Sequence, residues 1–176
     1  MAIRNIVTVP EPVLRRKART VTTFDKSLQT LIDDMVETMR AAPGVGLAAP
    51  QVGISQRVIV VEYAEEEEAA EGQPPKEVKP RLYVMVNPEI VKASTETEMG
   101  VEGCLSVPGL VGEVERKQMI QVRGYNRRGQ PMKLKVSGWL ARIFQHEIDH
   151  LNGILFTDLA TQLWQPQTEE EAQDRV

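Results

Sequence analysis

The chain has 176 residues, of which 41% are hydrophobic and 26% are charged, and its formal net charge is -4. This length favours a single domain over residues 1–176 with one sizeable core, and the composition excludes an intrinsically disordered protein. The acidic balance provides no general basic surface, so direct nucleic-acid binding is not expected. A single cysteine excludes an internal disulfide, and no apolar run is long enough to cross a bilayer, so no membrane partner is expected.

The first predicted element is a helix within residues 22–44, "TTFDKSLQTLIDDMVETMRAAPG". Thr23 or Asp25 can cap its start, and Pro43 and Gly44 end it. Its apolar residues recur with the period of an α-helix and form one face, which consists of Leu28, Leu31, Ile32, Met35, Val36 and Met39. We therefore expect one buried face, in which the methionines fill the core.

The next part of the chain mixes irregular and extended patterns. Residues 43–56, "PGVGLAAPQVGISQ", contain too much glycine and proline for a regular element. The β-branched run "RVIVVEY" at 57–63 predicts a buried strand, and "RLYVMVNPEI" at 81–90 predicts a second strand that ends at Asn87. Between them, the acidic and then proline-rich residues 64–80 predict a solvated insertion loop.

A hairpin and a second helix complete the pattern. The segments "KQMIQVRGYN" at 117–126 and "QPMKLKVSG" at 130–138 predict a β-hairpin, in whose turn Gly129 can adopt a positive φ. The last strong helix is "GWLARIFQHEIDHLNG" at 138–153, which ends at an Asn-Gly stop. Its apolar stripe consists of Leu140, Phe144, Ile148 and Leu151.

Strands dominate the middle of this pattern, and helices lie near its two ends. The arrangement favours an α+β fold over regular βαβ alternation. Residues 161–176 lose periodicity and are expected to form a flexible tail. The amino-terminal segment lacks the apolar core of a secretory signal peptide, so a reducing compartment is expected.

Both histidines of the chain lie in the helical stretch "FQHEIDH" at 144–150, with Glu147 between them. His146 and His150 are four residues apart, so both rings project from one side of the helix and can bind one metal ion. At about 100° per residue, Glu147 projects about 60° beyond His150. It therefore borders the site as a partner for metal-bound water rather than as a third ligand.

The remaining arc of this helix carries Arg142, Gln145 and Asp149. Asp149 has three interpretations that the sequence leaves open: an acceptor for a histidine N–H, a partner of an arginine, or a solvated charge. Each interpretation keeps the carboxylate on the polar side of the helix.

A catalytic metal site needs a third protein ligand and an open position. No third histidine is present, and the glutamates at 169–171 lie on the predicted tail. Cys104, in "VEGCLSVPG", is the other candidate, because a thiolate and two imidazoles suit a divalent transition metal. A lone cysteine is also commonly a small buried hydrophobic residue, so this pattern alone leaves the third ligand open.

Three stretches together resemble a known family. "GVGLAAPQ" at 44–51, "EGCLS" at 102–106 and "QHEIDH" at 145–150 look like the signature motifs of peptide deformylases, in the same order and spacing. The resemblance extends from about Val7 to Leu159, and "VPEPVLRRKA" is similar to the usual amino-terminal segment of the family. It implies an α+β fold in which mixed or antiparallel β-sheets surround a central helix that carries HEIDH.

The resemblance also implies an activity, the removal of the formyl group from N-formylmethionine of nascent polypeptides with release of formate. It implies one divalent metal ion bound by Cys104, His146 and His150, with Fe2+ expected natively and Zn2+, Ni2+ or Co2+ also able to bind. The ligand set alone suits zinc at least as well as iron. In the implied mechanism, metal-bound hydroxide attacks the formyl carbon, and Glu147 acts as general base and then general acid.

Substrate contacts come from the first two motifs and the helix. By resemblance, the Gln51 side-chain amide and the Leu105 backbone N–H donate to the developing oxyanion. Gly44 and Gly46 either serve turn chemistry or let an extended substrate backbone lie against the loop. The candidate apolar walls of a methionine pocket are Val45, Leu105, Ile143 and Phe144, of which Phe144 lies nearest the core stripe.

The chain departs from related sequences at Val111, where an arginine is often present, and this puts one substrate-anchoring contact in doubt. Some family members present a basic terminal helix to the ribosome, whereas the tail of this chain is acidic. Contact with the ribosome through the tail is therefore not expected. Because no transit peptide is recognised, a bacterial cytoplasmic location is expected rather than an organellar one.

Two other functions compete with deformylation. One is a metallopeptidase that cuts internal peptide bonds, which shares HExxH but requires histidine or glutamate as its third ligand. The other is a catalytically inactive metal-binding or adaptor module. Replacement of Cys104 with alanine tests the first alternative, and Glu147→Gln tests the second.

Overall fold

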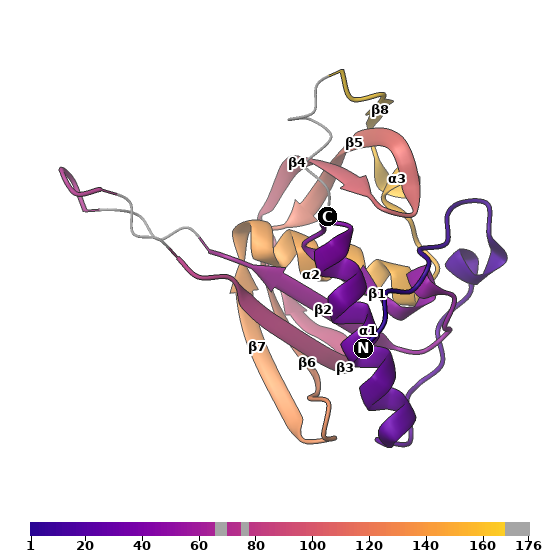
Figure 1. Ribbon diagram of the computed structural model, residues 1–176. Coiled ribbons are helices and arrows are strands. Elements are labelled where there is room, and N and C mark those ends of the chain that lie inside the picture. Colours follow the sequence, from indigo (N-terminus) through magenta and orange to yellow (C-terminus); the bar gives the residue numbers. More distant parts are fainter. Residues whose placement is uncertain (66–69, 75–77, 168–176) are drawn as a thin grey trace.

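Two β-sheets with a helix between them form the framework of the chain (Figure 1). The computed structural model describes residues 1–65, 70–74 and 78–167. The larger sheet has the order β1 (Gly46–Ala48), β2 (Val58–Tyr63), β3 (Arg81–Ala93), β6 (Met119–Tyr125) and β7 (Pro131–Ser137). The smaller sheet has the order β4 (Thr97–Cys104), β5 (Val107–Lys117) and β8 (Gln162–Trp164). Every pair of neighbouring strands is antiparallel, which confirms the α+β prediction in its antiparallel form.

Helix α2 contacts strands of both sheets, and helix α1 packs on the opposite face of the larger sheet. The helical elements are α1 (Lys26–Ala41), α2 (Gly138–Leu151), the short α3 (Phe156–Leu159) and the 3-10 turns η1 (Pro12–Arg15) and η2 (Ala49–Val52). Since α2 carries HEIDH, the predicted central position of this helix is confirmed. In the part of the chain that the structure describes, no helix combines the length and the apolar character needed to span a membrane.

The buried core has two halves, one on each face of the larger sheet, and strand β2 contributes to both. Its side chains alternate, so Ile59 and Val61 pack with α2, whereas Val58 and Val60 pack with α1. All four side chains are 0% exposed, which explains why this strand is a continuous apolar run in the sequence. The predicted buried strand at this position is confirmed.

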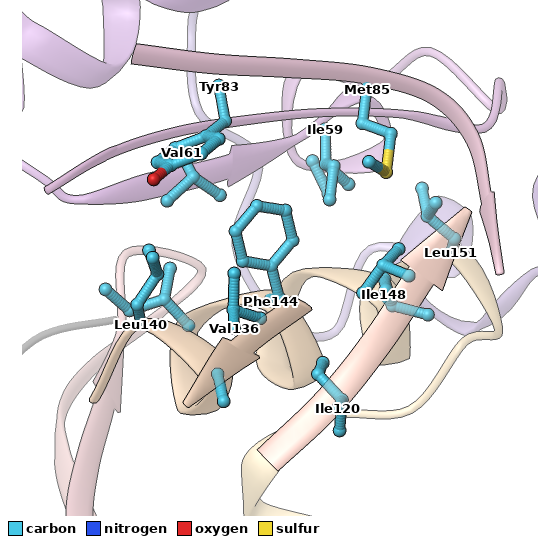
Figure 2. Close-up of a cluster of buried hydrophobic side chains, with 14 of the residues drawn as sticks. Ile59, Val61, Tyr83, Met85, Ile120, Val136, Leu140, Phe144, Ile148 and Leu151 are labelled. Carbon is cyan, nitrogen blue, oxygen red and sulfur yellow. The ribbon is translucent and has the colours of Figure 1, made fainter. Parts of the chain in front are cut away.

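The predicted apolar stripe of α2 is confirmed, and it packs on the larger sheet. Figure 2 shows Phe144 pointing from the helix toward the side chains of β2 and β3, between Leu140 and Ile148. Its ring meets the Tyr83 ring edge to face, with the centroids 5.5 Å apart. This packing fixes the rotation of α2 about its axis, so the opposite side of the helix faces the smaller sheet.

The first helix also agrees with the prediction. It begins at Lys26, and the Asp25 side chain accepts a hydrogen bond from the Leu28 backbone N–H at 2.9 Å. All six residues of the predicted apolar face are buried. Asp25, rather than Thr23, is therefore the capping residue.

The predicted end of the second strand at Asn87 is wrong, because β3 continues to Ala93. Asn87 has a positive φ of 52°, and the pairing of β3 with β6 shifts register between Val86 and Glu89. The Asn87 side chain accepts from the Val21 backbone N–H and donates to the Val21 carbonyl, each at 2.9 Å. These bonds from outside the sheet stabilise a bulge at which the strand would otherwise stop.

Regular elements also occur in segments for which none was predicted. The Gly- and Pro-rich stretch forms strand β1 and turn η2, and residues 97–117 form the β4–β5 hairpin. Residues 162–164 of the stretch expected to be a flexible tail form β8, which pairs with β5. The remainder of that stretch from residue 168 lies outside the described residues. In each case backbone pairing with a distant segment supplies order that the local pattern lacks.

The insertion between β2 and β3 has no helix or strand in its described residues. Figure 1 places residues 70–74 well away from both sheets and from the helices. Residues 66–69 and 75–77 of the predicted loop lie outside the described residues. For the described part, the prediction of a solvated loop agrees with the exposure of residues 70–74.

Candidate metal centre

The structure brings the three predicted metal ligands together at the junction of α2 and the smaller sheet. The Cys104 Sγ lies 3.3 Å from His150 Nε2, and His150 Nε2 lies 3.2 Å from His146 Nε2. All three side chains are buried, and the three ligand atoms lie within 4.8 Å of one another. One sulfur and two imidazole nitrogens at these separations can surround one cation, and this donor set suits a divalent transition metal.

Each ligand is positioned by a different part of the fold. Cys104 ends strand β4, where a register shift follows Gly103, and it packs in a small cluster with Phe156 of α3. The Phe156 ring stacks on His146, with the centroids 6.2 Å apart. Because α2 is fixed by its apolar stripe, His146 and His150 necessarily face this cluster.

Glu147 lies at the edge of the centre as a buried carboxylate without a partner. It is 0% exposed, and neither of its oxygens has a hydrogen-bond partner among the described residues. Burial has the largest effect on the ionisation of this carboxyl group, and it raises the pKa of Glu147 to about 7. A buried polar group without a partner is costly in a folded protein, so the arrangement indicates a functional role.

Gly46 of β1 faces this carboxylate directly. A Cβ atom at Gly46 would lie only 2.7 Å from Glu147 Oε1, so any larger residue would displace the carboxylate. Glycine is therefore required at position 46 because Glu147 approaches the backbone closely. A turn is not the reason, since Gly46 lies in a strand. Gly44 is similarly confined, since its Cβ would lie 3.1 Å from Leu105 Cδ1.

The Gln51 side chain is oriented by two hydrogen bonds. Its Oε1 accepts from the Ala48 backbone N–H at 2.9 Å, and its Nε2 donates to Ser106 Oγ at 3.2 Å. The same Nε2 lies 3.6 Å from Cys104 Sγ. The amide therefore presents its N–H groups at the metal centre, with the oxygen held away from it.

Glu102 is the main site residue for which the sequence predicted no role. It is 0% exposed, and its carboxylate accepts two hydrogen bonds from Arg116, each at 2.9 Å, and lies 2.8 Å from His146 Nδ1. Burial opposes ionisation of Glu102, but the bonds from Arg116 and His146 outweigh it and hold its pKa well below the usual range. A carboxylate on Nδ1 leaves Nε2 free to bind a cation. Its place within "EGCLS" was the only signal in the sequence.

Asp149 is a partner of an arginine, which decides among its three interpretations. Arg116 Nη1 donates to Asp149 Oδ2 at 2.6 Å. The supposed polar arc of α2 is largely buried, with Arg142 at 4% and Gln145 at 7% exposure. Arg142 donates to the Val114 carbonyl, and Gln145 accepts from the Lys117 backbone N–H, so both side chains bond to strand β5 of the smaller sheet. The amphipathic pattern therefore marks two packed sides of the helix.

The two histidines differ in electrostatic environment. Burial lowers the pKa of His146, but interactions with Cys104 and Glu102 outweigh it and raise the pKa to about 10. Burial and the neighbouring His146 lower the pKa of His150 well below its usual value. A metal ligand must present an unprotonated nitrogen, so a cation at this centre competes with the proton on His146.

The candidate substrate residues separate into two groups. Val45 and Leu105 are half-buried at the loop and the hairpin turn, next to β1. Ile143 and Phe144 are 0% exposed and pack within the core cluster beneath the larger sheet. Val111 is also buried, and it pairs with Trp164 of β8, so it presents no exposed side chain to a substrate.

Comparison with known proteins agrees with this geometry. Residues 3–165 match the family model described as "Polypeptide deformylase". The peptide deformylase of Symbiobacterium thermophilum is 52% identical over 93% of this chain and 69% of its own length, and peptide deformylase 1 of Bacillus subtilis is 44% identical over 99% and 98%. The crystal structure of the Ehrlichia chaffeensis peptide deformylase matches with a TM-score of 0.81 and 42% identity over 92% of this chain and 89% of that chain.

The Thermotoga maritima peptide deformylase matches with a TM-score of 0.78 and 42% identity over 92% of this chain and all of that chain. The Ehrlichia chaffeensis enzyme is also known in complex with actinonin. The family match covers every residue of the candidate metal centre, from Gln51 to His150. On this evidence, the chain belongs to the polypeptide deformylase family.

Proposed function

We propose that the centre formed by Cys104, His146 and His150 carries out the deformylation of N-formylmethionyl peptides, with Glu147 as the proton carrier. The observation that supports it most is a buried carboxylate, without a partner, beside three converging ligand atoms. Cys104 supplies the third ligand that a histidine or a glutamate would provide in a metallopeptidase. The single cysteine and both histidines of the chain therefore serve one centre.

A divalent cation bound by these ligands would lower the pKa of a coordinated water and polarise the formyl carbonyl. Fe2+ is the ion we propose for the native protein, with Zn2+, Ni2+ and Co2+ as alternatives that the same donors accept. The buried Glu102 would hold His146 in the tautomer that presents Nε2 to the cation.

Glu147 would accept the proton from the attacking water and later pass it to the departing amine. A base for this task works best with a pKa near the working pH, and burial raises the pKa of Glu147 to about 7. Gly46 gives the carboxylate the space to lie against β1. The backbone of β1 at Gly46 and the position of Glu147 on α2 together place the carboxylate.

Gln51 would donate a hydrogen bond to the formyl oxygen as negative charge develops there, together with the Leu105 backbone N–H. The orientation of the amide by Ala48 and Ser106 supports this role, because no reorganisation is needed during the reaction. One such donor commonly contributes about 3 kcal/mol of transition-state stabilisation. The Gln51→Ala variant is therefore expected to lose about 10²- to 10³-fold in kcat.

Strand β1 offers a place for the substrate backbone. It is the edge strand of the larger sheet and pairs with β2 on one side only among the described residues. An extended peptide can add to such an edge, with Val45 and Leu105 beside it as apolar contacts for a methionine side chain. Ile143 could contribute to the floor of this pocket from α2.

The remaining expectations concern the setting of the reaction. We expect residues 1–176 to act as one catalytic domain on nascent peptides, in the cytoplasm of a bacterium. Any contact with the ribosome is expected to use a surface other than the acidic tail. Since actinonin binds the Ehrlichia chaffeensis relative, we expect it to inhibit this chain as well.

The test is formate release from formyl-Met-Ala by protein purified anaerobically, with metal analysis of the same sample. We expect turnover in proportion to the bound metal, and loss of both in the Cys104→Ala variant. Absence of formate with every divalent metal tried would overturn the proposal. Unchanged metal content and turnover in Cys104→Ala would remove the sulfur ligand and restore the metallopeptidase alternative.

A further inference from the structure

A second buried arginine, Arg142, binds the carboxylate that supports His146. It lies on α2 one turn before His146, and its side chain is 5% exposed. Arg142 Nη1 donates to Glu102 Oε2 at 2.7 Å and to the Val114 carbonyl at 2.9 Å. Its Nη2 donates to the Glu98 carbonyl at 2.8 Å. The guanidinium is thus held by acceptors on both strands of the β4–β5 hairpin.

The space for this guanidinium exists because residue 100 is a glycine. A Cβ atom at Gly100 would lie 2.6 Å from Arg142 Cζ and 2.8 Å from its Nε and Nη2. The Trp139 ring also lies near, with its centroid 5.4 Å from Arg142 Cζ. A methyl group at position 100 could not be accommodated unless the guanidinium moved away from Glu102.

Arg142 and Arg116 do not have the same role toward Glu102. Arg116 forms ion pairs with two carboxylates, those of Glu102 and Asp149. Among the described residues, the only ion pair of Arg142 is with Glu102. The Glu102 Oε1 atom faces Arg116 and His146, and its Oε2 atom faces Arg116 and Arg142. Removal of Arg142 would leave Oε2 with a single donor, and the carboxylate would then be held by Arg116 and His146 alone.

We propose that Arg142, in the space left by Gly100, is a positioning residue that fixes Glu102 against His146 Nδ1 and so sets the affinity of the centre for its metal ion. The inference rests on the proposed metal centre. Outer partners of ligand histidines commonly contribute about 10- to 100-fold to metal affinity, because they orient the ring and select its tautomer. Neither Gly100 nor Arg142 contacts the ligand atoms themselves.

The primary measurement is Zn2+ affinity by chelator competition, with thermal unfolding of the metal-free protein alongside. Arg142→Met is expected to lose about 10- to 100-fold in Zn2+ affinity. Arg142→Lys is expected to lose less than Arg142→Met, because its ammonium keeps a positive charge for Glu102. It is still expected to lose some affinity, because one nitrogen cannot replace the two guanidinium nitrogens that reach Glu102, Val114 and Glu98. Arg123→Met, which removes an exposed arginine paired with Glu89 on the larger sheet, is the matched control and should bind Zn2+ like the parent.

Gly100→Ala tests the same contact without deleting any polar group. Its added methyl should displace the guanidinium and weaken Zn2+ binding to an extent similar to Arg142→Met. The double variant Gly100→Ala/Arg142→Met should then bind no more weakly than Arg142→Met alone, since both changes remove one interaction. In Co2+-loaded protein, both single variants should change the visible absorption bands that report ligand geometry, whereas Arg123→Met should not.

Parent-like Zn2+ affinity and Co2+ spectra in both Arg142→Met and Gly100→Ala would overturn the inference, as would additive losses in the double variant. If Arg142→Met fails to fold, Arg142→Lys and Gly100→Ala decide the question by the same criterion. Failure of the parent protein to bind Zn2+ at all would instead contradict the proposed metal centre. The two proposals therefore fail in different ways.

Discussion

Helix α2 has two sides that are equally buried, but one side is apolar and the other is polar. Toward the larger sheet it presents Leu140 and Phe144, at 1% and 0% exposure, and toward Cys104 it presents His146 and His150, at 2% and 1%. Glu147, also polar and at 0% exposure, faces Gly46 of β1. The apolar side needs no specific partners, because burial itself stabilises it by about 25 cal/mol per Å². The polar side is tolerated only where each atom finds a partner. Glu147, which finds none in the described residues, therefore marks where a substrate and its water are expected.

The largest effect is expected at that carboxylate. Glu147→Gln keeps the shape of the side chain and removes the proton acceptor, so kcat should fall by about 10²- to 10⁴-fold. The metal content should stay at the parent value, because Glu147 is not among the ligand atoms. Formate release and metal analysis of one preparation measure both quantities. Turnover within a few-fold of the parent would contradict the proton-transfer role.

Glu102 tests whether the polar side depends on its partners. Glu102→Ala would leave Arg116, Arg142 and the His146 ring without their shared acceptor. Breaking a buried ion pair on one side commonly costs about 3–5 kcal/mol of the free energy of unfolding. Denaturant unfolding of metal-free protein measures this cost, and chelator competition should show weaker Zn2+ binding as well. A variant as stable as the parent would mean that the network contributes only to metal binding.

Phe144→Ala is the matching change on the apolar side. It should also cost about 3–5 kcal/mol of the free energy of unfolding, through lost burial and the cavity left behind. Unlike Glu102→Ala, it should leave the Zn2+ affinity of the folded protein near the parent value, because Phe144 contacts the sheet rather than the ligands. A loss of Zn2+ affinity as large as that of Glu102→Ala would show that the two sides of α2 are not independent.

The smallest effect concerns pH. Because the pKa of Glu102 in the folded chain lies below its ordinary value of 4.5, the unfolded chain takes up the proton first as the pH falls. The stabilisation from Glu102 is therefore present above pH 4.5 and declines below it, by at most about 1.4 kcal/mol per pH unit. Unfolding of metal-free Glu102→Gln between about pH 5 and about pH 3 should show a correspondingly flatter decline than the parent. Equal slopes would indicate that Glu102 titrates normally.

The apolar side of α2 could be predicted from the sequence because its signal is local. Leu140, Phe144 and Ile148 recur at helical spacing, and the cap of α1 and the β6–β7 turn are likewise encoded within a few residues. The spacing of His146 and His150 placed both rings on one side of the helix in the same way. Cys104 was a candidate third ligand by its residue type, and only the resemblance to a family singled it out, because nothing local connects a hairpin turn to a distant helix.

The supporting network could not be predicted, because its partners are far apart in the chain. Arg116 lies 14 residues from Glu102 and 33 from Asp149, and no pattern in the sequence pairs them. The same reason explains the wrong strand end at Asn87, whose hydrogen bonds reach Val21, 66 residues away. The sequence predicted a polar arc of α2 with Arg142, Gln145 and Asp149, but it contained no sign that the smaller sheet covers Arg142 and Gln145. Only the position of the β4–β5 hairpin over α2 shows that this polar arc is buried rather than exposed to solvent.

The most direct test of the metal centre is X-ray absorption spectroscopy of the Zn2+-loaded protein at the zinc edge. The geometry predicts one sulfur ligand at about 2.3 Å and two imidazole nitrogens at about 2.0–2.1 Å, together with a light-atom ligand in the open position. In Cys104→Ala the sulfur contribution should disappear. A spectrum of the parent protein without a sulfur ligand would contradict the coordination proposed here and the reaction that depends on it.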